Sequence, residues 1–113
     1  MRIALIDDNK TILTINEVML KKEGYIVNDD ISKFSEIKDL SNETISYFIN
    51  EFDIIICDQD LGVGKVNGLD FLKKVIEKNS SKTCILLTGD DSLLLKAKTA
   101  MSKNINYLIK NND

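Results

Sequence analysis

Short apolar runs alternate along the chain with segments in which apolar residues recur at helical spacing. Three runs contain no polar residue, and they span residues 3–6, 54–57 and 84–87. Strands without polar alternation are typical of parallel sheets that helices cover on both faces. Two weaker runs, residues 25–27 and 107–109, complete a set of five predicted strands. The pattern therefore predicts a parallel sheet whose strands are connected by helices.

Four amphipathic stripes fill the gaps between the predicted strands, and each indicates a helix. The apolar residues of these stripes are Ile12, Ile15, Met19 and Leu20; Ile45, Phe48, Ile49 and Phe52; Leu69, Leu72, Val75 and Ile76; and Leu93, Leu94, Ala97 and Met101. Gly24 is expected to end the first helix, because glycine is common just after a helix C-terminus. Strands and helices thus alternate, and right-handed connections give a doubly wound open sheet.

Polar residues that can do chemistry gather at the ends of the predicted strands. They are Asp7 and Asp8, Asp58, Asp60, Thr88 and Lys110. In open sheets of this kind, ligands bind at the carboxyl ends of the strands. Carboxylates a few ångströms apart repel one another, and a divalent ion with oxygen ligands relieves that repulsion. The sequence therefore predicts a Mg²⁺ site that faces a hydroxyl group and an ammonium group.

Composition narrows the classes of protein. A chain of 113 residues with 43% hydrophobic and 29% charged residues is typical of one globular domain. The net charge of -3 provides no basic surface for a nucleic acid. No apolar run approaches the roughly 20 residues that span a bilayer, and the N-terminus lacks the pattern of a signal peptide, so we expect a cytoplasmic protein that does not contact membranes. Because histidine is absent, a phosphoryl group would have to come from another molecule.

At these strand ends the sequence resembles the receiver domain of two-component response regulators. The residues that carry the resemblance are the acid pair Asp7-Asp8, Asp58, Thr88, Lys110 and the aromatic Tyr107. The separations of 30 residues from Asp58 to Thr88 and 22 residues from Thr88 to Lys110 are those of a typical receiver. The resemblance covers residues 1–113 as one domain. It implies a flavodoxin-like five-stranded parallel sheet of order 2-1-3-4-5 with helices on both faces.

The resemblance also implies a phosphoacceptor and its metal ligands. Asp58 would accept the phosphoryl group. Asp7, Asp8 and Asp58 would bind Mg²⁺ through their carboxylates, and Asp60 would contribute its backbone carbonyl.

Three further residues would respond to the phosphoryl group. Lys110 would pair with Asp58 and then with a phosphoryl oxygen, and Thr88 would form a hydrogen bond with the aspartyl phosphate. Tyr107 would turn inward when Thr88 moves, so that added charge changes the conformation of the domain.

The implied function is a phosphorylatable switch in a two-component phosphorelay. A sensor histidine kinase or phosphotransfer protein would be its partner, with a second copy or a downstream output protein as further candidates. Such a chain is not an enzyme in the ordinary sense, because it catalyses only its own phosphoryl transfer and dephosphorylation. Two alternatives stay open: a pseudo-receiver that only mediates protein–protein interaction, and a Toprim-like metal-dependent phosphotransfer domain. The second is suggested by Asp58-Gln59-Asp60, although no glutamate follows the first strand.

Three features depart from the receiver pattern. Gly68 follows Asp58 by ten residues, two more than usual, which predicts a longer and more mobile loop. Asn111 replaces the proline that commonly follows the lysine. The chain stops at Asp113 without a fifth helix, so half of one sheet face is expected to expose apolar side chains. A fragment of a longer protein, a covering partner or second copy, and a decayed fold are the three explanations.

Overall fold

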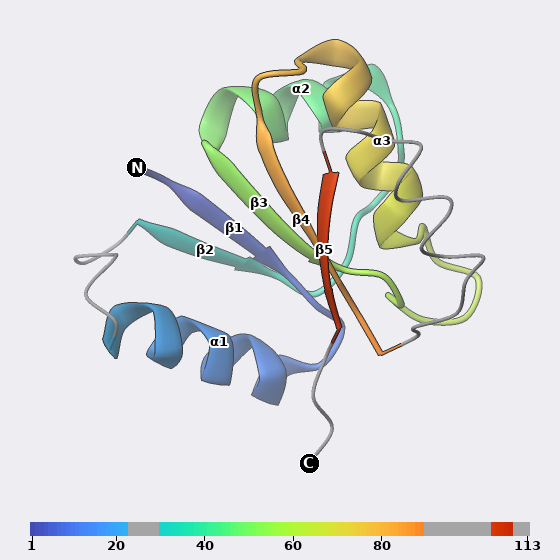
Figure 1. Ribbon diagram of the computed structural model, residues 1–113. Coiled ribbons are helices and arrows are strands. Elements are labelled where there is room, and N and C mark those ends of the chain that lie inside the picture. Colours follow the sequence, from blue (N-terminus) through green and yellow to red (C-terminus); the bar gives the residue numbers. More distant parts are fainter. Residues whose placement is uncertain (23–29, 90–104, 110–113) are drawn as a thin grey trace.

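Five parallel strands form one sheet in the computed structural model, which describes residues 1–22, 30–89 and 105–109 (Figure 1). The strands are β1 (Ile3–Ile6), β2 (Ile31–Phe34), β3 (Ile54–Asp58), β4 (Thr83–Thr88) and β5 (Ile105–Ile109). Their order across the sheet is β2-β1-β3-β4-β5, and every neighbouring pair is parallel. This confirms the doubly wound, flavodoxin-like sheet that the sequence predicts.

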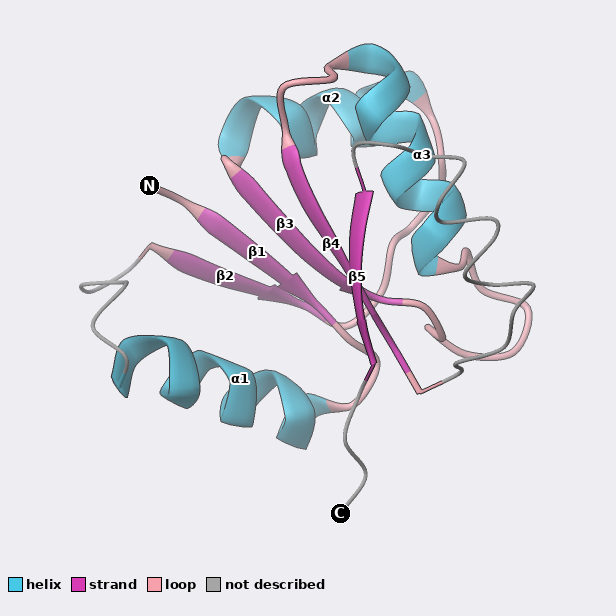
Figure 2. Cartoon of the chain, in the orientation of Figure 1, coloured by secondary structure: helices cyan, strands magenta, loops and turns pink. Residues whose placement is uncertain are grey.

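Three described helices lie on the two faces of the sheet. Helix α1 (Lys10–Lys22) covers one face, and α2 (Asn42–Glu51) and α3 (Gly68–Lys78) cover the other (Figure 2). Side-chain caps define where the last two begin, because a cap supplies an acceptor for an N–H group that has no partner inside the helix. The Ser41 hydroxyl accepts from the N–H of Thr44 at 3.2 Å, and Asn67 does the same for Asp70 at 2.9 Å.

The main core lies between the sheet and helices α2 and α3. Ile55 and Cys57 of β3 and Cys84 and Leu86 of β4 are completely buried there. Aromatic rings from the helices fill the space above them. The buried rings of Phe48 and Phe71 have centroids 5.0 Å apart. Each fully buried aliphatic or aromatic side chain contributes about 1.5–3 kcal/mol, so this layer supplies much of the stability of the domain.

The opposite face of the sheet is covered unevenly. Leu13 of α1 packs on Ile3 and Leu5, so the β1 part of this face is buried. The outward residues of β3 and β4 are only half-buried: Ile54, Ile56, Ile85 and Leu87. Ile54 and Ile56 lie against the edge of the cluster that contains Leu13, whereas Ile85 and Leu87 belong to neither core cluster of the described residues (Figure 1). The half-covered face that the sequence predicts is therefore present among the described residues.

One expected strand lies elsewhere in the structure, and other expected elements fall outside the described residues. The strand predicted at residues 25–27 lies outside the described residues, and the second strand of the sheet is β2 at Ile31–Phe34. This strand forms one edge of the sheet, and its two central residues, Ser32 and Lys33, are polar, so it does not stand out as a purely apolar run. The fourth predicted helix, with Leu93 to Met101, and the expected end of α1 at Gly24 also lie outside the described residues.

Helix α1 buries a different residue from those in its predicted stripe. Ile15 and Met19 are 47% and 59% exposed, whereas Leu13 is 4% exposed. Leu20 of the predicted stripe, two helical turns after Leu13, packs against the same cluster, and Glu17 pairs with Lys33 of β2 at 3.1 Å. The apolar side chains of Ile15 and Met19 therefore face away from the covered part of the sheet. Within the described residues, no helix is long and apolar enough to span a bilayer.

Candidate functional site

Three polar residues are buried where the central strands end. Asp7 directly follows β1, while Asp58 ends β3 and Thr88 ends β4. Because β3 pairs with both β1 and β4 in parallel register, these strand ends lie next to one another. Asp7, Asp58 and Thr88 are only 2%, 4% and 2% exposed. Carboxylates are almost never this buried without partners, which marks the position as more than a solvated loop.

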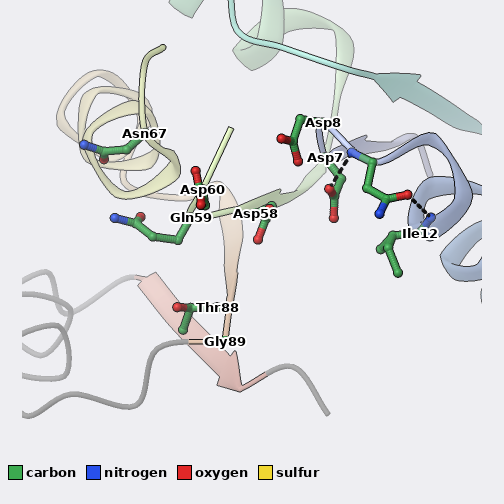
Figure 3. A pocket seen from close by; sticks show the side chains of 10 residues that line it. Asp7, Asp8, Ile12, Asp58, Gln59, Asp60, Asn67, Thr88 and Gly89 are labelled. Atoms are coloured by element: carbon green, nitrogen blue, oxygen red, sulfur yellow. Dashed lines mark hydrogen bonds between the residues drawn. The ribbon is translucent and has the colours of Figure 1, made fainter. Parts of the chain in front are cut away.

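A pocket of about 700 Å³ opens at this edge of the sheet (Figure 3). Asp7, Asp8 and Asp58 line it together with Thr88, and Asp60 lines it from the loop after β3. The sheet thus brings together residues that lie up to 81 positions apart in the sequence.

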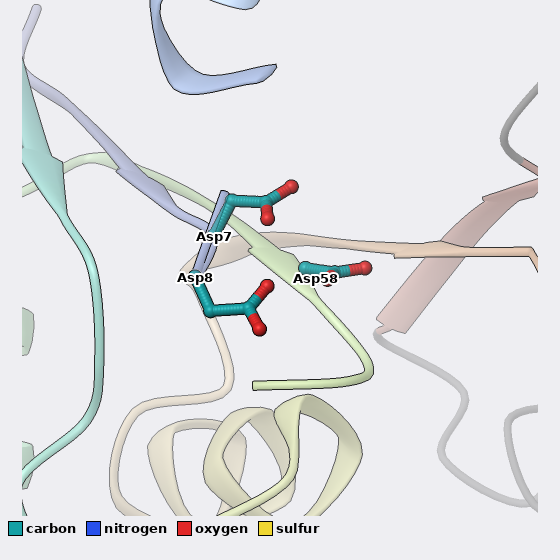
Figure 4. Close-up of side chains that lie close together, drawn as sticks. All are labelled: Asp7, Asp8 and Asp58. Atoms are coloured by element: carbon teal, nitrogen blue, oxygen red, sulfur yellow. The ribbon is translucent and has the colours of Figure 1, made fainter. Parts of the chain in front are cut away.

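Three of these acids are arranged as metal ligands. Asp7, Asp8 and Asp58 each offer a carboxylate oxygen, and the three oxygens lie within 4.8 Å of one another. Figure 4 shows the three carboxylates grouped around a shared space. Carboxylate oxygens are the ligands that hard divalent ions prefer, and such an ion would compensate charges that otherwise repel one another. This donor set therefore fits Mg²⁺.

Side-chain hydrogen bonds between the end of β1 and the start of α1 hold Asp7 of the acid pair in place. Asp7 Oδ1 accepts a hydrogen bond from the N–H of Asn9 at 2.9 Å. Asn9 Oδ1 in turn accepts from the N–H groups of Thr11 and Ile12, at 3.0 and 3.2 Å. The chain between strand and helix is thereby held by side-chain hydrogen bonds, and this fixes the direction in which the Asp7 carboxylate points.

The surroundings of Asp8 in the pocket raise its pKa. Partial desolvation raises the pKa of the Asp8 carboxyl above its usual value of 3.8. A side-chain hydrogen bond with Asp7 and the negative charges of Asp7 and Asp60 raise it further. The acids therefore repel one another when no cation is bound, and a bound cation would relieve that repulsion.

The loop between β3 and α3 lies beside the pocket. Gly62 and Gly64 adopt φ angles of +112° and +75°, which favour glycine, and Val63 between them is fully exposed. The loop contacts the segment after β2 through an ion pair of Lys65 with Glu36 at 3.2 Å. The structure thus contains the long, glycine-containing loop that the sequence predicts. The mobility of this loop stays a prediction.

Gly68 is required by a close approach to the candidate acceptor. A Cβ atom at this position would lie 2.2 Å from the backbone carbonyl oxygen of Asp58, so no other residue fits without a shift of the main chain. The glycine that opens α3 therefore sets the distance between this helix and the end of β3.

The remaining predicted site residues belong to β5 and the residue after it. Tyr107 lies in β5, where its Cα is paired with that of Leu86. Ile109 is paired with Thr88 at the ends of the two strands. Lys110 follows Ile109 in the sequence and lies outside the described residues.

Three pocket residues were not predicted from the sequence. Asn9, Gln59 and Asn67 all line the pocket. Asn67 could have been found, because an asparagine before a glycine and an aspartate three residues later is a common helix start. Gln59 had no such signal, since its role depends on contacts with residues ten positions away.

The sheet order and the acidic pocket at its carboxyl edge define a doubly wound α/β domain with a candidate metal site. Within this class, residues 3–113 match the family model of the response regulator receiver domain. The chain therefore belongs to the response regulator receiver domains of two-component systems. A search among curated proteins gives no significant match.

Solved structures show the same fold. A CheY-like response regulator receiver domain protein from Methanospirillum hungatei JF-1 is 23% identical, with a TM-score of 0.75, and the match covers 99% of this chain and 82% of that one. Chemotaxis protein CheY4 of Vibrio cholerae is 20% identical, with a TM-score of 0.71 and coverages of 99% and 88%. A response regulator from Burkholderia pseudomallei, solved with a phosphorylated aspartic acid, a calcium ion and citrate, is 21% identical, with a TM-score of 0.72 and coverages of 99% and 61%.

Membership of the family has general consequences. Receiver domains are signalling domains and not classical enzymes. They bind divalent ions at an acidic pocket, and the cluster of Asp7, Asp8 and Asp58 is the corresponding pocket here. They interact with histidine kinases or phosphotransfer proteins and can form dimers.

Proposed function

We propose that this chain is a phosphorylatable switch of a two-component pathway and that Asp58 accepts the phosphoryl group. One observation carries the proposal: a buried Asp58 carboxylate shares a pocket with Asp7 and Asp8, with candidate ligand oxygens within 4.8 Å. Thr88 is buried at the end of the neighbouring strand and lines the same pocket. A carboxylate, a hydroxyl group and two further acids at one edge of the sheet are suited to phosphoryl transfer to the carboxylate.

The transfer forms one bond and breaks another. A carboxylate oxygen of Asp58 attacks phosphorus, and the bond from phosphorus to the donor atom breaks as the donor leaves. The chain contains no histidine, so the donor phosphohistidine belongs to a sensor kinase or phosphotransfer protein. An anionic nucleophile approaches an anionic phosphoryl group only where positive charge reduces their repulsion.

The residues of this chain would supply that environment. Asp7, Asp8 and Asp58, with the backbone carbonyl of Asp60, would hold Mg²⁺. When bound, Mg²⁺ neutralises charge on the transferring oxygens. Asp58 is held at the end of β3, so that its carboxylate meets the phosphoryl group inside a pocket that is closed from behind by the core.

Three residues would convert the new charge into a conformational change. The Thr88 hydroxyl would donate to a phosphoryl oxygen, and the Lys110 ammonium would pair with another. Tyr107 would then change its side-chain position along β5. Strands β4 and β5 are adjacent and in register at Thr88 and Ile109, which supports a path from the pocket to the outer strand of the sheet.

Family membership also supports a proposal for the location and the partners of this switch. We place it in the cytoplasm, with a histidine kinase or phosphotransfer protein as the phosphoryl donor. A second copy of the chain or a downstream output protein would read the phosphorylated state. The NtrC4 receiver domain, solved as a beryllofluoride-activated dimer, is a structural relative with a TM-score of 0.73 and 22% identity.

A direct test uses a small phosphodonor. We expect incubation with acetyl phosphate and Mg²⁺ to add one base-labile phosphoryl group, visible by intact-mass spectrometry, and Asp58→Asn to abolish it. The absence of an adduct in both proteins would contradict the proposal and favour the pseudo-receiver. Cleavage of phosphodiesters without an adduct would favour the Toprim-like alternative.

A further inference from the structure

The residue after the proposed acceptor connects three elements. Gln59 donates its backbone N–H to the carbonyl of Leu87 at 2.8 Å, which extends the pairing of β3 with β4 by one residue. Its backbone carbonyl accepts from the N–H of Gly68 at 3.0 Å. Its side-chain Oε1 accepts from the N–H of Leu69 at 2.8 Å. One half-buried residue thus ties the end of β3 to β4 and to the first turn of α3.

Gln59 acts as a second cap for α3. The first N–H groups of a helix have no partners inside the helix, and buried ones need acceptors from elsewhere. Asn67 supplies an acceptor for Asp70 at 2.9 Å, in the usual position of an N-cap. Gln59 supplies two more, for Gly68 and Leu69, from the preceding strand. The start of α3 is therefore fixed to the strand that carries the acceptor.

These hydrogen bonds also hold the main chain of Asp58. Gly68 approaches the Asp58 carbonyl so closely that there is no room for a Cβ atom. The Asp58 peptide is thus enclosed between Gly68 and the paired strand β4, and Gln59 keeps Gly68 in that position. A shift at the start of α3 would move the Asp58 backbone and with it the direction of the buried carboxylate.

The long loop begins and ends at this connection. Residues 60–67 leave β3 after Gln59 and return to it at Gly68. Val63, at the loop tip, is fully exposed, and the ion pair of Lys65 with Glu36 joins side chains that are each about half exposed. Exposed ion pairs contribute little, so the loop tip is weakly held compared with its base. The base of the loop, where Leu61 is buried in the core, connects the tip to Asp58.

We propose that Gln59 is a positioning residue, whose side-chain hydrogen bond to the Leu69 N–H isolates the acceptor from movements of the long loop. It would keep Asp58 and the backbone carbonyl of Asp60 in place for metal binding and phosphoryl transfer. In Figure 3 the Gln59 side chain extends to the side of Asp58 opposite Asp7 and Asp8, so it acts through the main chain and not as a metal ligand. This inference rests on the proposed phosphoacceptor function.

The test compares four variants with the unaltered chain. Gln59→Met keeps the length of the side chain but removes the oxygen acceptor, whereas Gln59→Glu keeps an acceptor oxygen. Ser41→Ala removes the cap of α2, a residue that does not line the pocket, and serves as the control for a general loss of helix capping. Gly64→Ala strains the loop tip at its φ of +75° without filling occupied space.

Three measurements separate positioning from stability. Amide hydrogen exchange at Leu69 reports the hydrogen bond itself, and a Mg²⁺ titration followed by NMR reports the metal site. The rate of adduct formation with acetyl phosphate reports the reaction. We expect Gln59→Met to speed exchange at Leu69, to weaken Mg²⁺ binding and to slow adduct formation, each by roughly three- to tenfold, the value of one hydrogen bond. Gln59→Glu should restore protection at Leu69, and Ser41→Ala and Gly64→Ala should leave both site measurements within about twofold.

Three results would overturn the positioning role. One is unchanged exchange at Leu69 in Gln59→Met. A second is an equal loss of Mg²⁺ affinity and adduct rate in Gln59→Met and Ser41→Ala, which would assign the effect to stability alone. If the unaltered chain forms no adduct while Gln59→Met still weakens Mg²⁺ binding, the proposed function fails and the positioning role stands. An adduct that forms at the same rate in Gln59→Met, with unchanged Mg²⁺ affinity, refutes the positioning role and leaves the function intact.

Discussion

Asp8 is the most exposed of the three acids that meet at the pocket, and its pKa is raised. Partial desolvation is the first cause, and the neighbouring Asp7 and Asp60 add to it. A raised pKa means that the folded chain binds this proton more tightly than the unfolded chain does. The associated stability is therefore present at low pH and is lost as pH rises through the folded-state pKa.

This electrostatic cost predicts the effect of removing the Asp8 charge. Without metal, Asp8→Asn should raise the melting temperature near neutral pH, because one of the repelling charges is gone. The same variant should lose most of the stabilisation by Mg²⁺, which for a ligand at about one hundred times its Kd is about 2.7 kcal/mol. Thermal unfolding with and without Mg²⁺ measures both, with Glu77→Gln, remote from the pocket, as the control. A lower melting temperature of metal-free Asp8→Asn would contradict this reading.

Asp39 shows the opposite shift. Hydrogen bonds from the side chains of Thr44 and Ser41 and from the backbone of Ser41 lower the pKa of Asp39 to about 2. A lowered pKa stabilises the fold above the unfolded-state value and loses this effect as pH falls through the folded-state value.

A pH series on Asp39→Asn tests that shift. The unaltered chain should be more stable than the variant by a constant amount at neutral and mildly acidic pH. The difference should shrink as pH falls below about 4, where the unfolded-state carboxyl becomes protonated. Urea unfolding at several pH values measures it. A difference that grows on acidification would show that the charge of Asp39 is not what stabilises the start of α2.

At the scale of single residues, the sequence predicts most of the acids and the hydroxyl group that line the pocket. Asp7, Asp8, Asp58 and Thr88 were identified because each follows or ends a recognisable strand, and parallel strands bring their carboxyl ends together. Gln59 was missed, because an amide side chain that reaches across a loop to Leu69 leaves no periodic signal. Local sequence patterns predict which helix or strand carries a side chain. Contacts between different helices and strands become visible only in the three-dimensional structure.

At the scale of elements, the junction between β3 and α3 is tightly constrained. Gly68 has no room for a side chain, whereas Gly64 has open space around it and only an unusual φ. The two glycines therefore separate steric from conformational effects in one loop.

Alanine in place of each glycine in turn should affect stability and Mg²⁺ affinity differently. Gly68→Ala should cost about 1–3 kcal/mol or more, because the Asp58 carbonyl must move, and it should reduce Mg²⁺ affinity as well. Gly64→Ala should cost about 1–2 kcal/mol through backbone strain alone and leave Mg²⁺ affinity unchanged. Chemical denaturation and Mg²⁺ titration of the two variants make the comparison. Equal Mg²⁺ affinities in both would show that α3 does not set the geometry of the acceptor.

Elements were predictable where their burial is simple. Strands β1, β3 and β4 are central, so their apolar runs were visible in the sequence. Edge strand β2 was misplaced, because Ser32 and Lys33 interrupt its apolar pattern. The inward side of α1 was predicted only in part, because Leu20 packs against the core as the stripe indicates, whereas Ile15 and Met19 are exposed and Leu13 is buried in their place.

At the scale of the whole molecule, the two faces of the sheet are unequal. Ile55 is completely buried beneath α2 and α3, whereas its neighbour Ile56 points to the other face and is half-buried. The two residues have the same side chain in the same strand, so they form a matched pair.

This asymmetry predicts a difference in stability. Ile55→Ala should cost about 2–5 kcal/mol, as expected for a buried isoleucine. Ile56→Ala should cost clearly less, about 1–2 kcal/mol, because less apolar surface returns to water on unfolding. Urea unfolding of both variants measures the difference. Equal costs would mean that the second face is covered as well as the first.

The central claim is that acids from separate strands form one metal site at which Asp58 becomes phosphorylated. The most direct measurement locates the modified residue. After incubation with acetyl phosphate, borohydride reduction converts an aspartyl phosphate to homoserine, and peptide mass spectrometry then identifies its position. We predict homoserine at residue 58 in the presence of Mg²⁺ and none when EDTA removes the metal. Homoserine at another aspartate, or an equal yield at residue 58 without metal, would contradict the account.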